Sequence, residues 1–442
     1  MKTVPAAQPS VTDRATQRVT RARHGLAVSL FFITAINYLD RTNMAVALPH
    51  ITDDLNLSPT QAGLILSAFA WSYALLQIPG GWLVDRFGPK LSFGYAMVGW
   101  SLVTIAVMLS RGFGVLLGMR LVLGVAEAPA FPANNRLVAA WFPPRERARA
   151  TAVYTAGEYV GLAVAVPLLS WVVATTSWHM IFLWTGLLGL AFSVLWFRRV
   201  YDTPHTSPRV NEAELAHIEG EEDAARQSGT TESGTKATTW SDLGFLLRRR
   251  RLWGMYIGQF ANTSVLYFFL TWFPTYLVEE KGMSTIKSGV LGSIPYLAAL
   301  GGVLLGGAWS DWLLRTGKAG TIARKTPIMT GFALAGIIVA ANFTTSVPLV
   351  ILFMSIAFFA QGMMALGWTL VADVAPVRLL GLTGGVFNFI SNVGGALTPI
   401  VVGVIYQSTG SFAPALVYIG ALAVLGLFAY LVLIDKVERL TI

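Results

Sequence analysis

Long apolar runs alternate with short polar breaks along almost the whole chain. A helix needs about 20 mostly apolar residues to cross a lipid bilayer, and twelve segments reach that length. The predicted spans are 25–48, 60–83, 91–110, 113–139, 150–173 and 179–199, followed by 253–277, 287–312, 326–344, 348–372, 382–406 and 412–434. The pattern therefore predicts an all-α integral membrane protein with twelve transmembrane helices in two groups of six.

The polar segments divide the chain into five parts. We expect an N-terminal tail at 1–24, a six-helix bundle at 25–199, a linker at 200–252, a second six-helix bundle at 253–434 and a tail at 435–442. The linker is rich in Ser, Thr, Gly and Glu, a composition typical of solvated chain. Within it the stretch NEAELAHIEGEEDAA predicts a short surface helix.

Composition supports the membrane assignment. The chain of 442 residues is 54% hydrophobic and only 12% charged, whereas soluble domains carry about 25% charged residues. It has no cysteine, which excludes disulfides and thiol chemistry. Its five histidines lack the spacing of metal ligands, so we expect no metal site and no bound cofactor.

The formal charge of +9 follows from membrane orientation. If the N-terminus is cytoplasmic, 26 of the 32 Lys and Arg residues fall in cytoplasmic segments. Such a bias orients membrane proteins, so both termini and the linker are predicted to be cytoplasmic. Since the basic residues then face anionic lipid, a nucleic-acid partner is not expected.

A few ionisable residues lie well within the predicted spans, where each costs about 2.5–3.5 kcal/mol at a helix centre. They are Asp40, Arg41, Arg120, Glu127 and Glu158. Such residues usually face a bundle interior or an aqueous cavity and mark function. The alternative is a set of buried structural ion pairs, and for Glu158 the sequence does not favour either interpretation.

Helix geometry constrains these residues. Arg120 and Glu127 are seven residues apart, so they share a face and lie about 10.5 Å apart along the axis. We expect Gly124 between them to leave room for a solute, and the helix to bend at the prolines that follow, Pro129 and Pro132. Asp40 and Arg41 are adjacent and point about 100° apart. One of them can therefore face a cavity while the other faces a neighbouring helix.

The chemistry of these four residues suggests how they work. Arginine stays charged and binds carboxylates through two parallel hydrogen bonds, so Arg41 and Arg120 predict an organic-anion site. The carboxyl groups of Asp40 and Glu127 beside them are candidate proton carriers, because changing partners alters proton affinity. No GxxxxGK[ST] motif and no nucleophile–base pair is present. We therefore expect an ion-driven transporter rather than an ATPase or another enzyme.

The two halves resemble each other at the end of their second span. The stretch GWLVDRFGPK has Gly81 four residues before Asp85, and Gly307 precedes Asp311 at the same spacing. A small residue beside the acid lets another helix approach closely. Asp85, Arg86 and Asp311 are therefore predicted to form a cytoplasmic gate.

GWLVDRFGPK resembles the loop signature of the major facilitator superfamily. NYLDRTNMAVALP, the fourth-span stretch RLVLGVAEAPAFPANNRLVAAWFPP and LTGGVFNFISNVGGALTP resemble its anion:cation symporters, among them the D-galactonate and other hexonate or hexarate permeases. The resemblance covers about 25–434. It implies two bundles related by pseudo-twofold symmetry, Asp40 and Glu127 as the proton-coupling pair, and Arg41 and Arg120 as ligands of the substrate carboxylate.

Further polar residues at mid-span resemble the sugar-acid contacts of that family. They are Tyr38, Tyr73, Gln259, Trp368 and Asn388. Membrane tyrosines and tryptophans also serve packing or interfacial roles, and Asn388 with Asn392 could simply join helices.

These features favour a proton-coupled symporter that imports a small organic anion, a D-galactonate-like sugar acid, by alternating access. The expected setting is a bacterial inner membrane, with the protein a monomer. One alternative is a permease for dicarboxylic or aromatic acids such as glucarate or phthalate. Another is a non-transporting ligand sensor.

Overall fold

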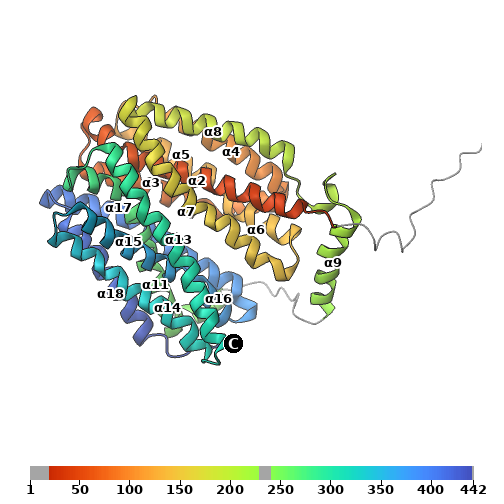
Figure 1. Ribbon diagram of the computed structural model, residues 1–442. Helices are drawn as coiled ribbons and strands as arrows, with labels where there is room; N and C mark the ends of the chain where they lie inside the picture. Colours follow the sequence, from red (N-terminus) through yellow and green to blue (C-terminus); the bar gives the residue numbers. More distant parts are fainter. Residues whose placement is uncertain (1–18, 228–239, 441–442) are drawn as a thin grey trace, which may run out of the picture.

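The computed structural model describes residues 19–227 and 240–440, in which every regular element is a helix (Figure 1). Most of the predicted N-terminal tail, the middle of the linker and the last two residues lie outside the described ranges. The N-terminal half contains α2 (Ala22–Leu55), α3 (Pro59–Phe87), α4 (Pro89–Val107), α5 (Phe113–Glu127), α6 (Ala130–Trp141), α7 (Pro144–Thr175) and α8 (Trp178–Arg199).

The linker and the C-terminal half supply the remaining elements. Between the halves lie η1 (Pro204–Thr206), α9 (Glu212–Gln227) and α10 (Trp240–Leu247). The C-terminal half contains α11 (Arg250–Thr271), α12 (Phe273–Thr275), η2 (Tyr276–Glu280), α13 (Thr285–Arg315), α14 (Gly320–Ala335), η3 (Gly336–Phe343), α15 (Val347–Met364), α16 (Gly367–Val374), η4 (Val377–Leu379), α17 (Leu380–Thr409) and α18 (Ala413–Val432).

Ten helical units of the described chain are long and apolar enough to cross a membrane, counting α5 with α6, α14 with η3, and α15 with α16 as single spans. The two other long helices, α2 and α11, are diluted by polar residues such as Asp40, Arg41 and Gln259. Together they make six spans in each half. The predicted all-helical fold is confirmed.

At Pro129, where a bend was expected, the helix is interrupted. Helix α5 ends at Glu127 and α6 begins at Ala130, because a proline lacks the N–H of the helical ladder and its ring collides with the preceding turn. The interruption leaves Glu127 as the last residue of α5.

The two bundles meet most closely at one end. We call this end, which holds the α2–α3 connection, the loop end, and the opposite end, where α2 begins and α18 finishes, the linker end. In Figure 1 the bundles converge at the left, where α3 and α17 lie side by side, and diverge toward α6, α9 and α16. Near the loop end a Cβ on Gly63 would lie 2.5 Å from the Pro399 carbonyl oxygen. The hydroxyl of Ser67 donates to the Ala396 carbonyl at 2.6 Å.

A second contact of the same kind joins α7 to α13. A Cβ on Gly289 would lie 2.4 Å from Ser170 Cβ. At the linker end, by contrast, ion pairs join helices within one half, as between Asp85 and Arg136 or between Asp311 and Arg324. The bundles are thus clamped together at the loop end.

The linker helix α9 is fastened to the N-terminal bundle. The buried carboxylate of Glu214 accepts hydrogen bonds from the backbone N–H of Ala22 at 3.0 Å and of Arg23 at 3.1 Å, and it also pairs with the Arg23 side chain at 3.0 Å. Arg23 in turn contacts Glu146 of α7 at 2.9 Å. The first N–H groups of a helix have no partners within it, so Glu214 caps α2 from a distant part of the chain.

Candidate substrate and proton site

The intramembrane charges predicted from the sequence gather in the N-terminal bundle. On α2, the adjacent residues Asp40 and Arg41 point in different directions. Arg41 reaches α5, where its Nε lies 3.0 Å from Glu127 Oε2. Asp40 points the other way, beside Thr185 of α8 and Trp100 of α4, and it is fully buried. The two side chains therefore have different nearest neighbours, although Asp40 is still within electrostatic reach of Glu127 and Arg120.

Aromatic rings surround the Arg41 guanidinium. Its Cζ lies 4.9 Å from the ring centroid of Tyr38 and 4.8 Å from those of Phe69 and Tyr73. A guanidinium within about 6 Å of a ring centroid is attracted by the ring's negative face. The three rings therefore form a cage that holds the Arg41 guanidinium in place.

Arg120 shares one wall of this cage. Its Cζ lies 5.2 Å from the Phe69 centroid, so two guanidinium groups lie around a single ring. Arg120 is buried, and its Nε and Nη1 have no hydrogen-bond partner among the described residues. Since a buried charge without partners is costly, this group is suited to receive an anionic ligand.

The expectation for Gly124 is wrong. A Cβ there would lie 2.2 Å from Ser72 Oγ and 2.5 Å from the Phe69 carbonyl oxygen. The glycine lets α3 pack directly on α5 and leaves no room for a solute. Its effect is to bring Phe69 and Tyr73 close to the charges on α5.

Glu158 of α7 belongs to the same group of residues. It is almost completely buried and lies beside the Tyr38 hydroxyl and within electrostatic reach of Arg41. Tyr267 of α11 is also close enough to Arg41 and Arg120 to interact with them electrostatically. The site therefore extends from the N-terminal bundle to the first helix of the C-terminal one.

The C-terminal half contributes a cluster of uncharged donors and acceptors. Gln259 donates to Ser391 Oγ at 3.1 Å and to Thr263 Oγ1 at 3.3 Å, and the two hydroxyls lie 2.6 Å apart. The sequence analysis identified Gln259 but missed the hydroxyls. Thr263 is four residues after Gln259 on the same helix face, whereas Ser391 gives no comparable signal.

The remaining predicted contacts are spread more widely. Asn388 accompanies Asn392 on α17 and donates across the bundle interface to Gln77 Oε1 of α3 at 3.2 Å. Trp368 meets Phe387 with ring centroids 4.8 Å apart and is 47% exposed. Asn388 thus links the two halves, while Trp368 lies in a more open position.

The predicted gate residues occupy the linker end. Asp85 pairs with Arg136 of α6 at 2.5 Å, whereas the adjacent Arg86 lies over the rings of Trp82 and Phe87. In the other half, Arg324 lies 3.8 Å from Asp311 and 3.1 Å from Asp373. Each acid therefore has a basic partner from its own half, and the structure does not bring Asp85 and Asp311 together.

Comparison of the chain with known proteins identifies its family. The model of the Major Facilitator Superfamily matches residues 30–323. The chain belongs to the major facilitator superfamily. It is 43% identical over 424 residues to the D-galactonate transporter of Escherichia coli O6:H1, covering 95% of this chain and 97% of that protein.

Other relatives extend this likeness. A probable galactarate/D-glucarate transporter of Escherichia coli K12 is 39% identical over 432 residues, covering 96% of both chains. A solved bacterial homologue of the human lysosomal transporter Spinster superposes with a TM-score of 0.67 over 93% of this chain at 20% identity, which supports the fold alone. The chain is thus a multi-pass membrane transporter and not an enzyme, as predicted.

Proposed function

We propose that the protein is a proton-coupled symporter for a hydroxylated sugar acid, with a D-galactonate-like hexonate as its substrate. The observation that carries the proposal is the buried Arg41–Glu127 pair, set in an aromatic cage beside the unpartnered donors of Arg120. Relatives named as D-galactonate and galactarate/D-glucarate transporters support the sugar-acid class.

Competition for Arg41 couples the proton to the substrate. While Glu127 is ionised, it occupies the Nε of Arg41. A proton on Glu127 removes that charge, and the substrate carboxylate takes its place with Arg41 and Arg120. Burial makes this exchange effective, because a guanidinium in a low-dielectric site favours having one anion beside it. Asp40, which points about 100° away from Arg41 around α2, serves as a second proton carrier.

The polar cluster of the C-terminal half forms hydrogen bonds with the hydroxyl groups of the substrate. Gln259, Thr263 and Ser391 present amide and hydroxyl groups, which suit a polyhydroxylated chain better than an aromatic ring. This favours a sugar acid over a phthalate-like acid. A dicarboxylic sugar acid stays a second candidate, since two guanidinium groups can each bind a carboxylate and a relative at 39% identity is named for such substrates.

We place the linker end in the cytoplasm of a bacterial inner membrane, following the distribution of basic residues. With the loop end clamped through Gly63 and Gly289, the described conformation corresponds to the inward-facing state. Alternating access then requires these loop-end contacts to separate while the linker end closes around Asp85, Arg86 and Asp311.

Uptake by proteoliposomes tests the proposal. An inward proton gradient is expected to drive accumulation of labelled D-galactonate, and galactarate and D-glucarate are tested as competitors. Glu127→Gln should abolish uphill accumulation but retain exchange of internal for external substrate. If the gradient fails to accelerate uptake, or if Glu127→Gln still accumulates substrate, the coupling is refuted. Stronger competition by galactarate than by unlabelled D-galactonate would move the assignment to dicarboxylic sugar acids.

A further inference from the structure

Four consecutive arginines, Arg248 to Arg251, lie between the end of α10 and the first turn of α11 and divide into two pairs with different surroundings. Arg250 donates to the Val432 carbonyl at the end of α18. Arg251 contacts both carboxylate oxygens of Asp435, at 2.5 and 3.0 Å. The Arg251 side chain holds the pKa of Asp435 well below its usual range through these hydrogen bonds. This second pair therefore fastens α11 to α18.

The first pair is directed elsewhere. Arg248 and Arg249, both exposed, line an open groove together with Gly244 and Phe245 of α10. The Arg249 Cζ lies 4.1 Å from the Phe245 ring centroid, which fixes one guanidinium at the groove. Within the described ranges neither arginine forms an ion pair with an acidic side chain. Two guanidinium groups without acidic partners thus face one groove.

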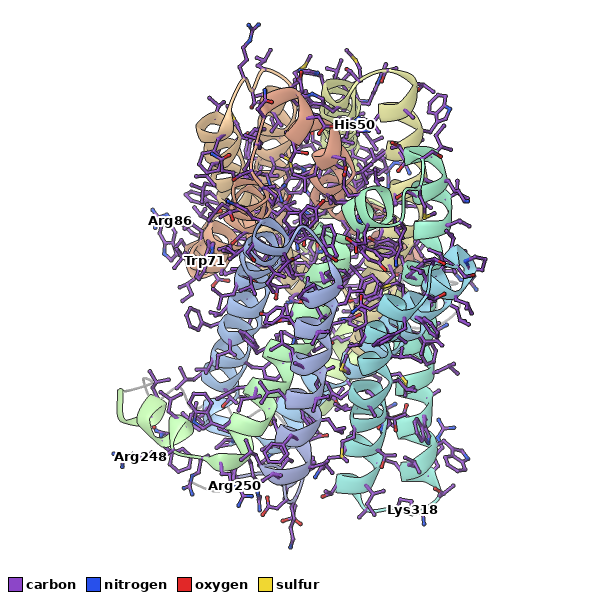
Figure 2. The ribbon with its side chains drawn as sticks, turned by 90° about the vertical axis from the view of Figure 1, so that its left-hand side faces the viewer. His50, Trp71, Arg86, Arg248, Arg250 and Lys318 are labelled. Atoms are coloured by element: carbon purple, nitrogen blue, oxygen red, sulfur yellow. The ribbon has the colours of Figure 1, made fainter. Side chains whose placement is uncertain are left out.

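The groove lies beside apolar side chains at the edge of the bundle. Leu247 is 39% exposed and Trp253 is 41% exposed, and the Trp253 indole donates to the Leu247 carbonyl at 2.7 Å. Tryptophan is typical of the membrane–water boundary. Figure 2 shows Arg248 and Arg250 at the same lower end of the C-terminal bundle as Lys318, with Arg248 next to a short helix that projects from the side of the bundle.

We propose that Arg248 and Arg249, with Gly244 and Phe245, bind the headgroup phosphate of an anionic phospholipid. Guanidinium groups bind phosphate oxygens through paired, charge-assisted hydrogen bonds. The exposed Leu247 and Trp253 provide apolar surface for the adjoining acyl chains, which a soluble phosphate would not need. Basic residues placed just outside a membrane span are also attracted by the negative surface of the cytoplasmic leaflet.

The proposed lipid site would attach the α10 end of the linker to the bilayer, in addition to its contact with the protein. Helix α9 is fastened to the N-terminal bundle through Glu214 and Arg23, whereas α10 is attached to the C-terminal bundle through Asp242 and Arg378. A lipid bound at Arg248 and Arg249 would anchor the second end of the linker to the bilayer. This role is independent of which substrate the transporter carries.

Lipid titration of the purified full-length protein tests the proposal. Thermal stability in neutral detergent is measured against added phosphatidylglycerol, phosphatidylcholine or inorganic phosphate. We expect phosphatidylglycerol to raise the apparent Tm of the wild type, and the concentration for half the effect to increase at least tenfold in R248Q/R249Q. The matched control is R315Q/K318Q, which removes two exposed charges at the same end of the same bundle and should titrate like the wild type.

The charge-preserving variant R248K/R249K distinguishes the loss of a lipid site from a folding defect. It should retain the preference for phosphatidylglycerol, and the lipid concentration for half the effect should increase only two- to fivefold. An unchanged titration in R248Q/R249Q, or an equal loss in R315Q/K318Q, would overturn the site. Stabilisation by inorganic phosphate as strong as that by phosphatidylglycerol would overturn the assignment to lipid.

Discussion

Gly63 is the residue at which a single methyl group should change the balance between transport states. Near the loop end its Cα faces α17, and an added Cβ would lie 2.5 Å from the Pro399 carbonyl oxygen. Ordinary contact begins at 3.4 Å, so Gly63→Ala requires α3 and α17 to separate by about 0.9 Å. Because the neighbour is backbone rather than a flexible side chain, the strain falls on the interface between the bundles.

The expected size of the effect follows from packing energetics. Overfilling a packed interface costs about 1–3 kcal/mol, and only the state with the loop end closed bears this cost. The ratio of loop-end-closed to loop-end-open molecules should therefore fall by about 5- to 150-fold. Alanine also favours helix over glycine by about 1 kcal/mol, but that gain applies equally to both states and cancels.

Distances between spin labels measure the shift. The chain has no cysteine, so Asn56→Cys and Ser408→Cys, at exposed loop-end positions, can be labelled without background. Gly63→Ala should move the distance distribution toward longer values. The control is Gly118→Ala in α5, where a Cβ would meet nothing within 4 Å. Identical distributions for the two alanine variants would refute the assignment of Gly63 to the closing contact.

Three further variants probe the site and the linker. Arg41→Lys keeps the charge but loses the planar fork, so the KM for D-galactonate in uptake assays should rise about 10- to 100-fold; an unchanged KM would contradict its role. Ser391→Ala should raise the KM about tenfold, with less effect on acids that have fewer hydroxyls. Glu214→Gln removes the buried partner of Arg23 at a cost of about 3 kcal/mol and should lower the apparent Tm in scanning fluorimetry, whereas Glu219→Gln, on the exposed face of α9, should not.

The helices were predictable because a bilayer imposes one requirement on every span. Each must be about 20 residues long and mostly apolar, and this requirement located all twelve spans, with the least accurate end, that of α2 at Leu55, seven residues beyond the predicted 48. The same physics identified four charged residues as candidates for function, because a charge inside a membrane span carries a large free-energy cost. They are Asp40, Arg41, Arg120 and Glu127. These predictions depend on local sequence alone.

Partners from distant segments could not be predicted in this way. Asp85 pairs with Arg136, 51 residues away, although Arg86 is adjacent in sequence. The Ser391 hydroxyl joins Gln259 from 132 residues away, and Glu214 caps a helix that begins 192 residues earlier. Gly124 was misinterpreted for the same reason, because a glycine beside a charge can admit either a ligand or a neighbouring helix. Only the packing of α3 decides between them.

The placement of Asp40 and Arg41 on adjacent positions of α2 has a mechanical consequence. Arg41 faces Glu127 and the aromatic cage, while Asp40 faces Trp100 and Thr185 inside the N-terminal bundle. A rotation or shift of α2 that frees Arg41 for a substrate carboxylate must also move Asp40 against α4 and α8. Asp40 is also within electrostatic reach of Glu127 on α5, so the two buried acids are linked both through α2 and through their charges. Under the proposed function, protonation of either acid would bias the same movement of α2, which is the physical requirement for coupling a proton to a substrate.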